Sequence, residues 1–197
     1  MPAIIRTIIF TALLAAQALL FPTALGAQNT AKPQDPTRIV GPEVSIQGRD
    51  IVVSAALRLG ADQRREVESG ISKEITLFID LFRVWDVWPD EFVLGRRLVQ
   101  TLRCDPVKKE YIATSLEGST IKEKRFRDCG ELMEWALNVE GVRLANTSEL
   151  EPSVYFVKVT AESHVKRLPP IIRSLFFFIR EAEFKVTKES PPFGIKK

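Results

Sequence analysis

Runs in which apolar and polar residues alternate recur along the chain from Glu43 onward, and they constrain its fold more than any other feature. A period of two places successive side chains on opposite faces, as in a strand with one buried face. The alternating runs cover residues 43–47, 51–57, 75–85, 92–104, 109–114, 120–126 and 182–186. Short turns, such as Gly48-Arg49 and Asp105-Pro106, separate several of them. The pattern therefore predicts antiparallel hairpins.

Two of these runs predict how the sheet faces its surroundings. In the run 75–85, apolar residues occupy both faces, with Phe78 and Phe82 opposite a face made of Ile75, Leu77, Ile79 and Leu81. This predicts partial cover on both sides of the strand. In the run 92–104, the residues expected to point inward are Phe92, Leu94, Leu98 and Leu102. The run 154–161 is almost continuously apolar, which predicts a central strand.

Two segments depart from this period and predict helices. Residues 61–69 are charged and are followed by Gly70, which predicts a short surface helix. A second helix is expected from Asp128 to Gly141, because Asp128 and Glu131 suit the N-cap and N3 positions. Its apolar stripe consists of Leu132, Trp135, Ala136 and Val139. The elements predict an α+β domain, with a mostly antiparallel curved sheet or half-open barrel packed on two helices.

The N-terminal segment indicates where the protein is located in the cell and says little about its fold. Arg6 is the only charge before Lys32, and an apolar stretch followed by small residues comes after it. This layout is typical of a secretory signal peptide. We expect a signal peptide at 1–27, either cleaved or kept as an anchor, a flexible linker at 28–42, and one domain at 43–195. The protein is then exported to the periplasm or to the outer face of the cytoplasmic membrane.

Composition and motifs narrow the function classes. The 28 Lys and Arg residues nearly balance 25 Asp and Glu residues, so nucleic acid is not an expected partner. The sequence offers no Gly-rich phosphate loop, no nucleophile elbow and no metal-ligand spacing, and its only histidine is His164. Asp80 lies in an apolar strand, where it is either a perturbed acid or the partner of Arg83 or Arg97. We therefore expect a non-enzymatic protein without cofactor or metal.

Cys104 and Cys129 are the two cysteines of the chain. An even count in an exported chain is compatible with one disulfide. Such a bond would close a loop of about 25 residues and contribute roughly 3.5 kcal/mol in the chain-entropy model. The alternative is two unrelated buried thiols, because the sequence does not show whether the two Cα atoms come within bonding distance.

Two apolar segments are candidates for partner binding. Arg83, Trp85, Asp86 and Trp88 gather at the end of a predicted strand. The two tryptophans are either lids on the core or an exposed anchor for a protein partner. The second segment has the spacing of a short amphipathic helix, through Ile172, Leu175, Phe176 and Ile179. It either closes the sheet or contacts lipid or a membrane protein.

Several short sequence motifs, in the order in which they occur, resemble those of one bacterial family. They are Ser69-Gly70-Ile71, the cluster 83–88, the stretch 101–111, Leu168-Pro169-Pro170, Phe184-Lys185 and the stretch 192–195. The chain resembles the family called domain of unknown function 4390 over about residues 38–195. The resemblance implies an exported envelope protein and no established activity, cofactor or catalytic residue. Members are often encoded beside a membrane sensor kinase, and they usually carry Tyr where this chain has Cys104.

Two functional hypotheses follow. The first is a protein-interaction module of the cell envelope that binds a membrane or envelope protein, with a membrane sensor kinase as the partner suggested by the family. Under this hypothesis, the protein also makes peripheral contact with the membrane. The second is a periplasmic carrier of an apolar small molecule or lipid, because a curved sheet around a helix can hold a Phe-lined cavity.

Overall fold

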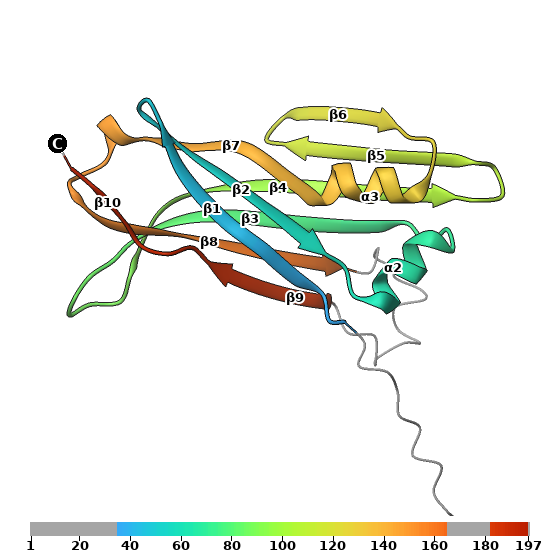
Figure 1. Cartoon of the computed structure of the whole chain (residues 1–197), viewed down its shortest axis with the longest axis horizontal. Helices are drawn as coiled ribbons and strands as arrows, with labels where there is room; N and C mark the ends of the chain where they lie inside the picture. The colour runs from blue at the N-terminus through green and yellow to red at the C-terminus, as the bar shows by residue number, and fades with distance from the viewer. Residues whose placement is uncertain (1–34, 165–181, 197) are drawn as a thin grey trace, which may run out of the picture. The chain divides into compact units, whose positions relative to one another are not determined.

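A computed structural model describes residues 35–164 and 182–196, and antiparallel strands make up most of them (Figure 1). The larger sheet has seven strands in the order β10-β8-β3-β4-β5-β6, with β9 also paired to β8. Its strands are β3 (Lys73–Arg83), β4 (Glu91–Asp105), β5 (Glu110–Glu117), β6 (Thr120–Arg125), β8 (Ser153–His164), β9 (Ala182–Glu189) and β10 (Phe193–Ile195). The smaller sheet has the order β1-β2-β7, made of β1 (Arg38–Gln47), β2 (Asp50–Arg58) and β7 (Asn138–Asn146). The helical elements are α2 (Ala61–Glu68), α3 (Cys129–Leu137) and the 3-10 turn η2 (Thr147–Glu149).

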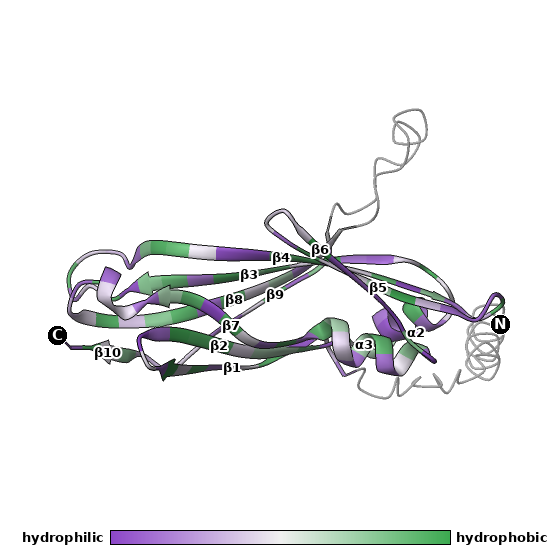
Figure 2. Cartoon of the chain, turned by 90° about the horizontal axis from the view of Figure 1, so that it is seen from above, coloured by the Kyte–Doolittle hydropathy of each residue, from purple (hydrophilic) through white to green (hydrophobic). Residues whose placement is uncertain are grey.

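The hydrophobic core lies between the two sheets. Figure 2 shows them as two layers, with α3 in the same layer as the smaller sheet. The smaller sheet and α3 both pack on one face of the larger sheet, α3 against β4 and β5. Both layers contribute fully buried residues, including Ile51, Val53, Ile75, Ile79, Leu81 and Leu132. The expected class, a mostly antiparallel sheet with two helices, is confirmed; the second sheet was not foreseen.

The alternation expected in β3 is confirmed. Its inward face carries the buried residues Ile75, Leu77, Ile79 and Leu81, and the outward Phe78 and Phe82 are partly covered. Leu98 and Leu102 of β4 are buried in the same core. The burial of one whole face of β3 explains why its period of two is so regular: a slip of one residue would move every apolar side chain to the wrong face.

The inward orientation expected for Phe92 is wrong. Leu81 of β3 pairs with Leu94, but its neighbour Phe82 pairs with Phe92, so Val93 is an additional residue in β4. This β-bulge changes which face the following residues occupy. Phe92 consequently lies against the Phe82 ring and is 57% exposed.

The second helix ends earlier than expected. It stops at Leu137, because Asn138 has an extended backbone (φ −95°, ψ 117°), and β7 follows directly. Val139 therefore belongs to a strand that pairs with β2 and not to the helical stripe. Gly141, expected to terminate the helix, has a φ of +65° and lies where the register with β2 shifts. This irregularity interrupts the period of two that would have indicated a strand. The expected N-cap is present, since the Asp128 side chain accepts a hydrogen bond from the Glu131 amide.

The domain begins earlier than Glu43. β1 starts at Arg38, within the range expected to be a linker. Gly41, with a φ of +87°, and Pro42 form a register shift against β2, and pairing continues on both sides of it. A proline is tolerated at such a bulge, so it does not end the strand. The proposed signal peptide (1–27), the first part of the linker, and residues 165–181 lie outside the described residues.

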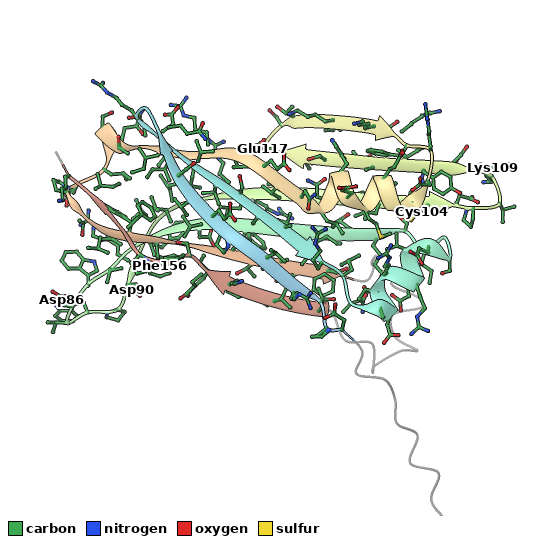
Figure 3. All side chains as sticks on the ribbon, viewed as in Figure 1. Asp86, Asp90, Cys104, Lys109, Glu117 and Phe156 are labelled. Atoms are coloured by element: carbon green, nitrogen blue, oxygen red, sulfur yellow. A yellow bond between two sulfur atoms is a disulfide. The ribbon has the colours of Figure 1, made fainter. Side chains whose placement is uncertain are left out.

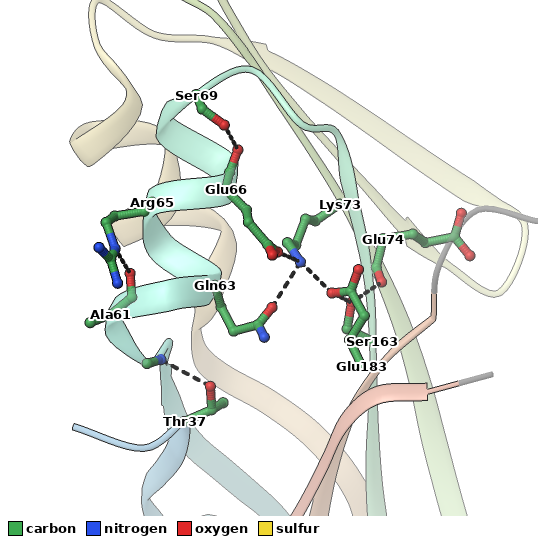
Figure 4. Close-up of polar contacts among 11 residues, drawn as sticks. Thr37, Ala61, Gln63, Arg65, Glu66, Ser69, Lys73, Glu74, Ser163 and Glu183 are labelled. Carbon is green, nitrogen blue, oxygen red and sulfur yellow. Dashed lines mark hydrogen bonds and ion pairs between the residues drawn. The ribbon is translucent and has the colours of Figure 1, made fainter. Parts of the chain in front are cut away.

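Two sets of contacts fasten the helices to the larger sheet. Cys104 of β4 and Cys129 of α3 are bonded as a disulfide, with Cα atoms 5.7 Å apart. Lys73 of β3 is almost completely buried, and its Nζ donates to Gln63 Oε1 of α2 at 2.8 Å. Figure 4 shows that the same amine also contacts the carboxylates of Glu66 and Glu183. Because Glu66 belongs to α2 and Glu183 to β9, this one cation joins three elements.

β8 lies inside the larger sheet, next to its last strands, and is paired along both edges, as its apolar run predicted. β3 pairs with one edge of β8, and both β9 and β10 pair with the other. Between these two short strands, Ser190 donates its amide to Val157 O at 2.8 Å and accepts from Val157 N through Oγ at 3.0 Å. β9 contains the expected last strand, whereas β10 was not predicted.

Candidate functional site

The loop between β3 and β4 presents large apolar side chains to solvent. Trp85 is 45% exposed, Val87 87% and Trp88 75%, and the neighbouring Phe92 is also exposed. Single exposed apolar residues are common on protein surfaces, but several on one hairpin form a patch of the kind that marks an interaction site. We call these four residues the hairpin tip. The sequence left open whether its tryptophans cover the core, and in the structure they do not.

Arg83, at the end of β3, packs against the Trp85 ring of the hairpin tip. Its guanidinium lies 5.4 Å from the centre of the Trp85 ring, 2.9 Å from Glu151 Oε2 and 3.6 Å from Glu91 Oε2. The neighbouring Tyr155 hydroxyl raises the pKa of Arg83 above its already high value; burial opposes this, and the carboxylates of Glu151 and Glu91 add to it. Only 17% of the Arg83 side chain is exposed. Arg83 therefore positions Trp85 and does not itself form a free contact surface, which differs from the direct contact expected from the sequence.

The two tryptophans are held differently. Trp85 donates its indole Nε1 to Glu91 Oε2 at 3.2 Å, and its backbone amide donates to Asp90 Oδ1 at 3.4 Å. Trp88 makes no hydrogen bond or ring contact with any residue that the structure describes. The tip thus combines one fixed ring with one free ring. Asp86, Asp90 and Glu91 give this loop an acidic rim.

An aromatic row continues from the hairpin tip onto the outer face of the larger sheet. The Phe82 ring lies edge-on to Phe92 at 5.8 Å and stacks on Phe156 at 5.3 Å. The three rings belong to β3, β4 and β8. Lys158 Nζ lies 4.7 Å from the centre of the Phe82 ring and 3.1 Å from Glu189 Oε1. The amine therefore covers part of this row and limits its exposure.

Asp80 occupies the outer face next to this row. It lies opposite Lys158 on β8 and Gly95 on β4. A Cβ atom at Gly95 would come within 2.2 Å of Asp80 Oδ1, so the carboxylate fills the space that a side chain there would need. Burial raises the pKa of Asp80 above its ordinary value, and the charge of Lys158 partly offsets this. The cation that acts on Asp80 is Lys158, and not Arg83 or Arg97 as the sequence suggested.

A separate groove of about 740 Å³ lies between β5 and β6 on one side and α3 and β7 on the other. Its walls include apolar side chains such as Leu98 and Trp135, but half of its lining residues are charged. The charged residues are Glu117, Lys122, Lys124, Arg125, Arg127, Glu131, Glu134 and Glu140. No sequence pattern indicates this groove, because it forms only where the two sheets meet. Its charged lining does not favour an apolar ligand.

The other predicted sites have simple outcomes. The segment of Ile172, Leu175, Phe176 and Ile179 lies outside the described residues. Within residues 35–164 and 182–196, no group of three or more His, Cys, Asp and Glu residues is placed to hold a metal ion. In the same ranges, no helix has the length and apolar character needed to cross a bilayer. Val87 and Phe92 were missed as tip residues, although apolar residues beside a turn between Asp86 and Asp90 were an available signal.

The fold and the exposed tip define a class of protein: a two-sheet antiparallel α+β domain whose β3–β4 hairpin presents an apolar surface. No curated protein sequence and no solved structure matches the chain. A family model does match, over residues 34–190, and its description is "Domain of unknown function (DUF4390)". The match covers most of the chain, so the protein belongs to this family, as the sequence motifs indicated.

Proposed function

We propose that this protein is a non-enzymatic interaction module of the bacterial cell envelope that binds another protein through its hairpin tip. The observation that carries the proposal is the exposure of Trp88 and Val87 beside a positioned Trp85. Tryptophan is among the residues that dominate the binding energy of protein interfaces. A ring that is already fixed loses little conformational entropy when a partner binds, which favours affinity.

The rim of the tip indicates the chemistry of the partner. Asp86 makes no ion pair or hydrogen bond within the described part of the chain, and Asp90 and Glu91 lie on the same loop. An acidic rim around an apolar centre suits a protein surface that combines apolar and basic residues. It suits an anionic lipid surface poorly, because like charges repel. We therefore expect a protein partner in the envelope, and the outer part of a membrane sensor kinase is the partner class that the family suggests.

In-cell photo-crosslinking tests the proposal. A photo-reactive amino acid replaces Trp88 in one version and Val107 in the other, a matched control because Val107 is 90% exposed in the turn between β4 and β5. We expect one recurring envelope protein to be captured from position 88 and not from position 107. The variant Trp85→Ala/Trp88→Ala should lose co-purification of that protein, while Val107→Ala retains it.

The proposal fails if position 88 captures only lipid, or if the double variant folds and still co-purifies the same protein. The carrier hypothesis makes a different prediction. It requires an apolar small molecule or lipid to remain with gently purified protein, which native mass spectrometry detects. Repeated recovery of one such molecule would favour the carrier over the interaction module.

A further inference from the structure

We infer that the groove between β6 and β7 is a second binding site, and that it takes an extended peptide which adds to the free edge of β7. The site is distinct from the hairpin tip. It is defined by an unpaired strand edge, by two buried polar atoms without partners, and by two oppositely charged walls. Each of these features matches a property of an extended polypeptide.

One edge of β7 is not paired with any described strand. β7 is the last strand of the sheet β1-β2-β7, and β2 occupies one of its edges. Asn138, Val139, Glu140 and Val142 of β7 line the groove, and no residue of β2 does. The groove therefore lies on the free side of β7, where no described strand pairs with it. An open edge can accept a further strand through main-chain hydrogen bonds.

At this site, two carboxamide oxygens are buried and have no hydrogen-bond partner among the described residues. Gln100 is only 7% exposed, and its Nε2 donates to Ser115 Oγ at 3.0 Å, which leaves Oε1 without a partner in the described chain. Turning the amide over would instead leave Nε2 unpaired. Asn138 Oδ1, at the start of β7, is likewise buried without a partner there. Buried polar atoms are normally paired. Both oxygens are closed off from solvent, so the N–H donors of a peptide main chain reach them only when these two side chains turn into the groove.

The charges of the groove indicate the side chains of the peptide. Lys122 and Lys124 line the β6 wall, and Glu134 and Glu140 line the wall of α3 and β7. None of these four residues forms an ion pair with another described residue. Lys124 Nζ instead lies 5.7 Å from the centre of the Trp135 ring. Because side chains alternate along a strand, one peptide face can present acidic groups to the lysines while the other presents basic groups to the glutamates.

The test begins with a phage-displayed library of random linear peptides, selected on the purified full chain. Enriched peptides are synthesised, and their affinities are measured by calorimetry. Each peptide is then scanned with N-methyl groups, one residue at a time. In a strand added to β7, every second amide points to the edge. We expect N-methylation at alternate residues to weaken binding by about tenfold, and at the residues between them to have little effect.

Variants locate the binding on the protein. Lys124→Ala removes a charge from the β6 wall, and Ile121→Ala is the matched control on the same strand. Ile121 does not line the groove and is exposed. We expect Lys124→Ala and Gln100→Leu to weaken the selected peptides, whereas Ile121→Ala and Trp88→Ala do not. The N-methyl scan uses the unaltered protein, so it remains informative even if a groove variant folds poorly.

Three results would overturn the inference. One is a selection that enriches no peptide above the uncoated support. Another is an N-methyl scan without alternation, which would mean that side chains alone are bound. The third is a full response to Trp88→Ala with none to Lys124→Ala, which would move the peptides to the hairpin tip.

Discussion

The two ends of the β3–β4 hairpin are built in opposite ways. At the end where β3 begins and β4 finishes, a disulfide and a buried lysine fasten α3, α2 and β9 to the sheet. At the other end, the loop carries exposed rings and an acidic rim. Figure 3 shows the separation, with Cys104 and Lys109 at one end and Asp86 and Asp90 at the other. Eleven residues of β3 lie between them, or about 36 Å at the usual rise per residue.

One end of the hairpin therefore contributes stability, and the other leaves apolar surface free for contact. At the fastened end, the buried Lys73 amine is paired with two carboxylates, and the disulfide includes the fully buried Cys104. The hairpin tip leaves apolar area in water, which brings the folded state nothing and leaves that area available to a partner.

Removing the disulfide should have the largest effect. The variant Cys104→Ala/Cys129→Ala opens a loop of about 25 residues, so the free energy of unfolding should fall by about 3.5 kcal/mol in the chain-entropy model. Denaturant titration measures the change. A reducing agent should lower the stability of the unaltered protein but not that of the variant. A variant as stable as the parent would show that this end does not depend on the bond.

Removing the buried amine should come next. In Lys73→Met, the carboxylates of Glu66 and Glu183 lose the cation that they share. Both carboxylates retain some access to water, so we expect a loss of about 2 kcal/mol, the scale of hydrogen bonds to charged groups. Lys108→Met is the control, because Lys108 is exposed and makes only a local ion pair with Asp105. Equal stability of the two variants would contradict the role given to Lys73.

Asp80 should give a smaller effect that depends on pH. Its folded-state pKa is raised above the ordinary 3.8, mainly by burial, so the folded chain holds the proton more tightly than the unfolded chain. Its contribution to stability is therefore largest below pH 3.8 and declines as the pH rises through the folded-state pKa. Asp80→Asn should be slightly more stable than the parent at neutral pH. The two stability curves should converge on acidification; curves that stay parallel would exclude this cause.

Trp88 should have the smallest effect on stability. The side chain makes no contact that the fold needs, so Trp88→Ala should change the free energy of unfolding by no more than about 0.5 kcal/mol. Thermal and denaturant unfolding measure it, alongside the crosslinking described above. A loss comparable to that of Lys73→Met would mean that the ring packs on the domain, and the contrast between the two ends would disappear.

The sequence predicts the parts of the fold that follow a local rule. The alternation of β3, the N-cap at Asp128 and the apolar run of β8 each follow from spacing or residue type, and each is present. The tryptophans of the tip were also named in advance, because two such residues beside a turn are unusual. Their exposure was left open, since it depends on what packs above them.

The features that the sequence does not predict come from irregular pairing and from tertiary contact. Val93 shifts the register and turns Phe92 outward, and Gly141 interrupts the alternation of β7. The groove arises where β6 and β7, about a dozen residues apart and in different sheets, face each other. No local pattern indicates that the side-chain oxygens of Gln100 and Asn138 lack hydrogen-bond partners at that junction.

The pairing of β8 also orders events in time. β3 pairs with one edge of β8, and β9 and β10 cover the other. Both strands are made after β8, with residues 165–181 in between. The ribosome makes the chain from the N-terminus, so β8 keeps one open edge until residues 182–195 have been made. Open edges recruit other strands. During synthesis, the nascent protein thus depends on the residues made last to cover the open edge of β8.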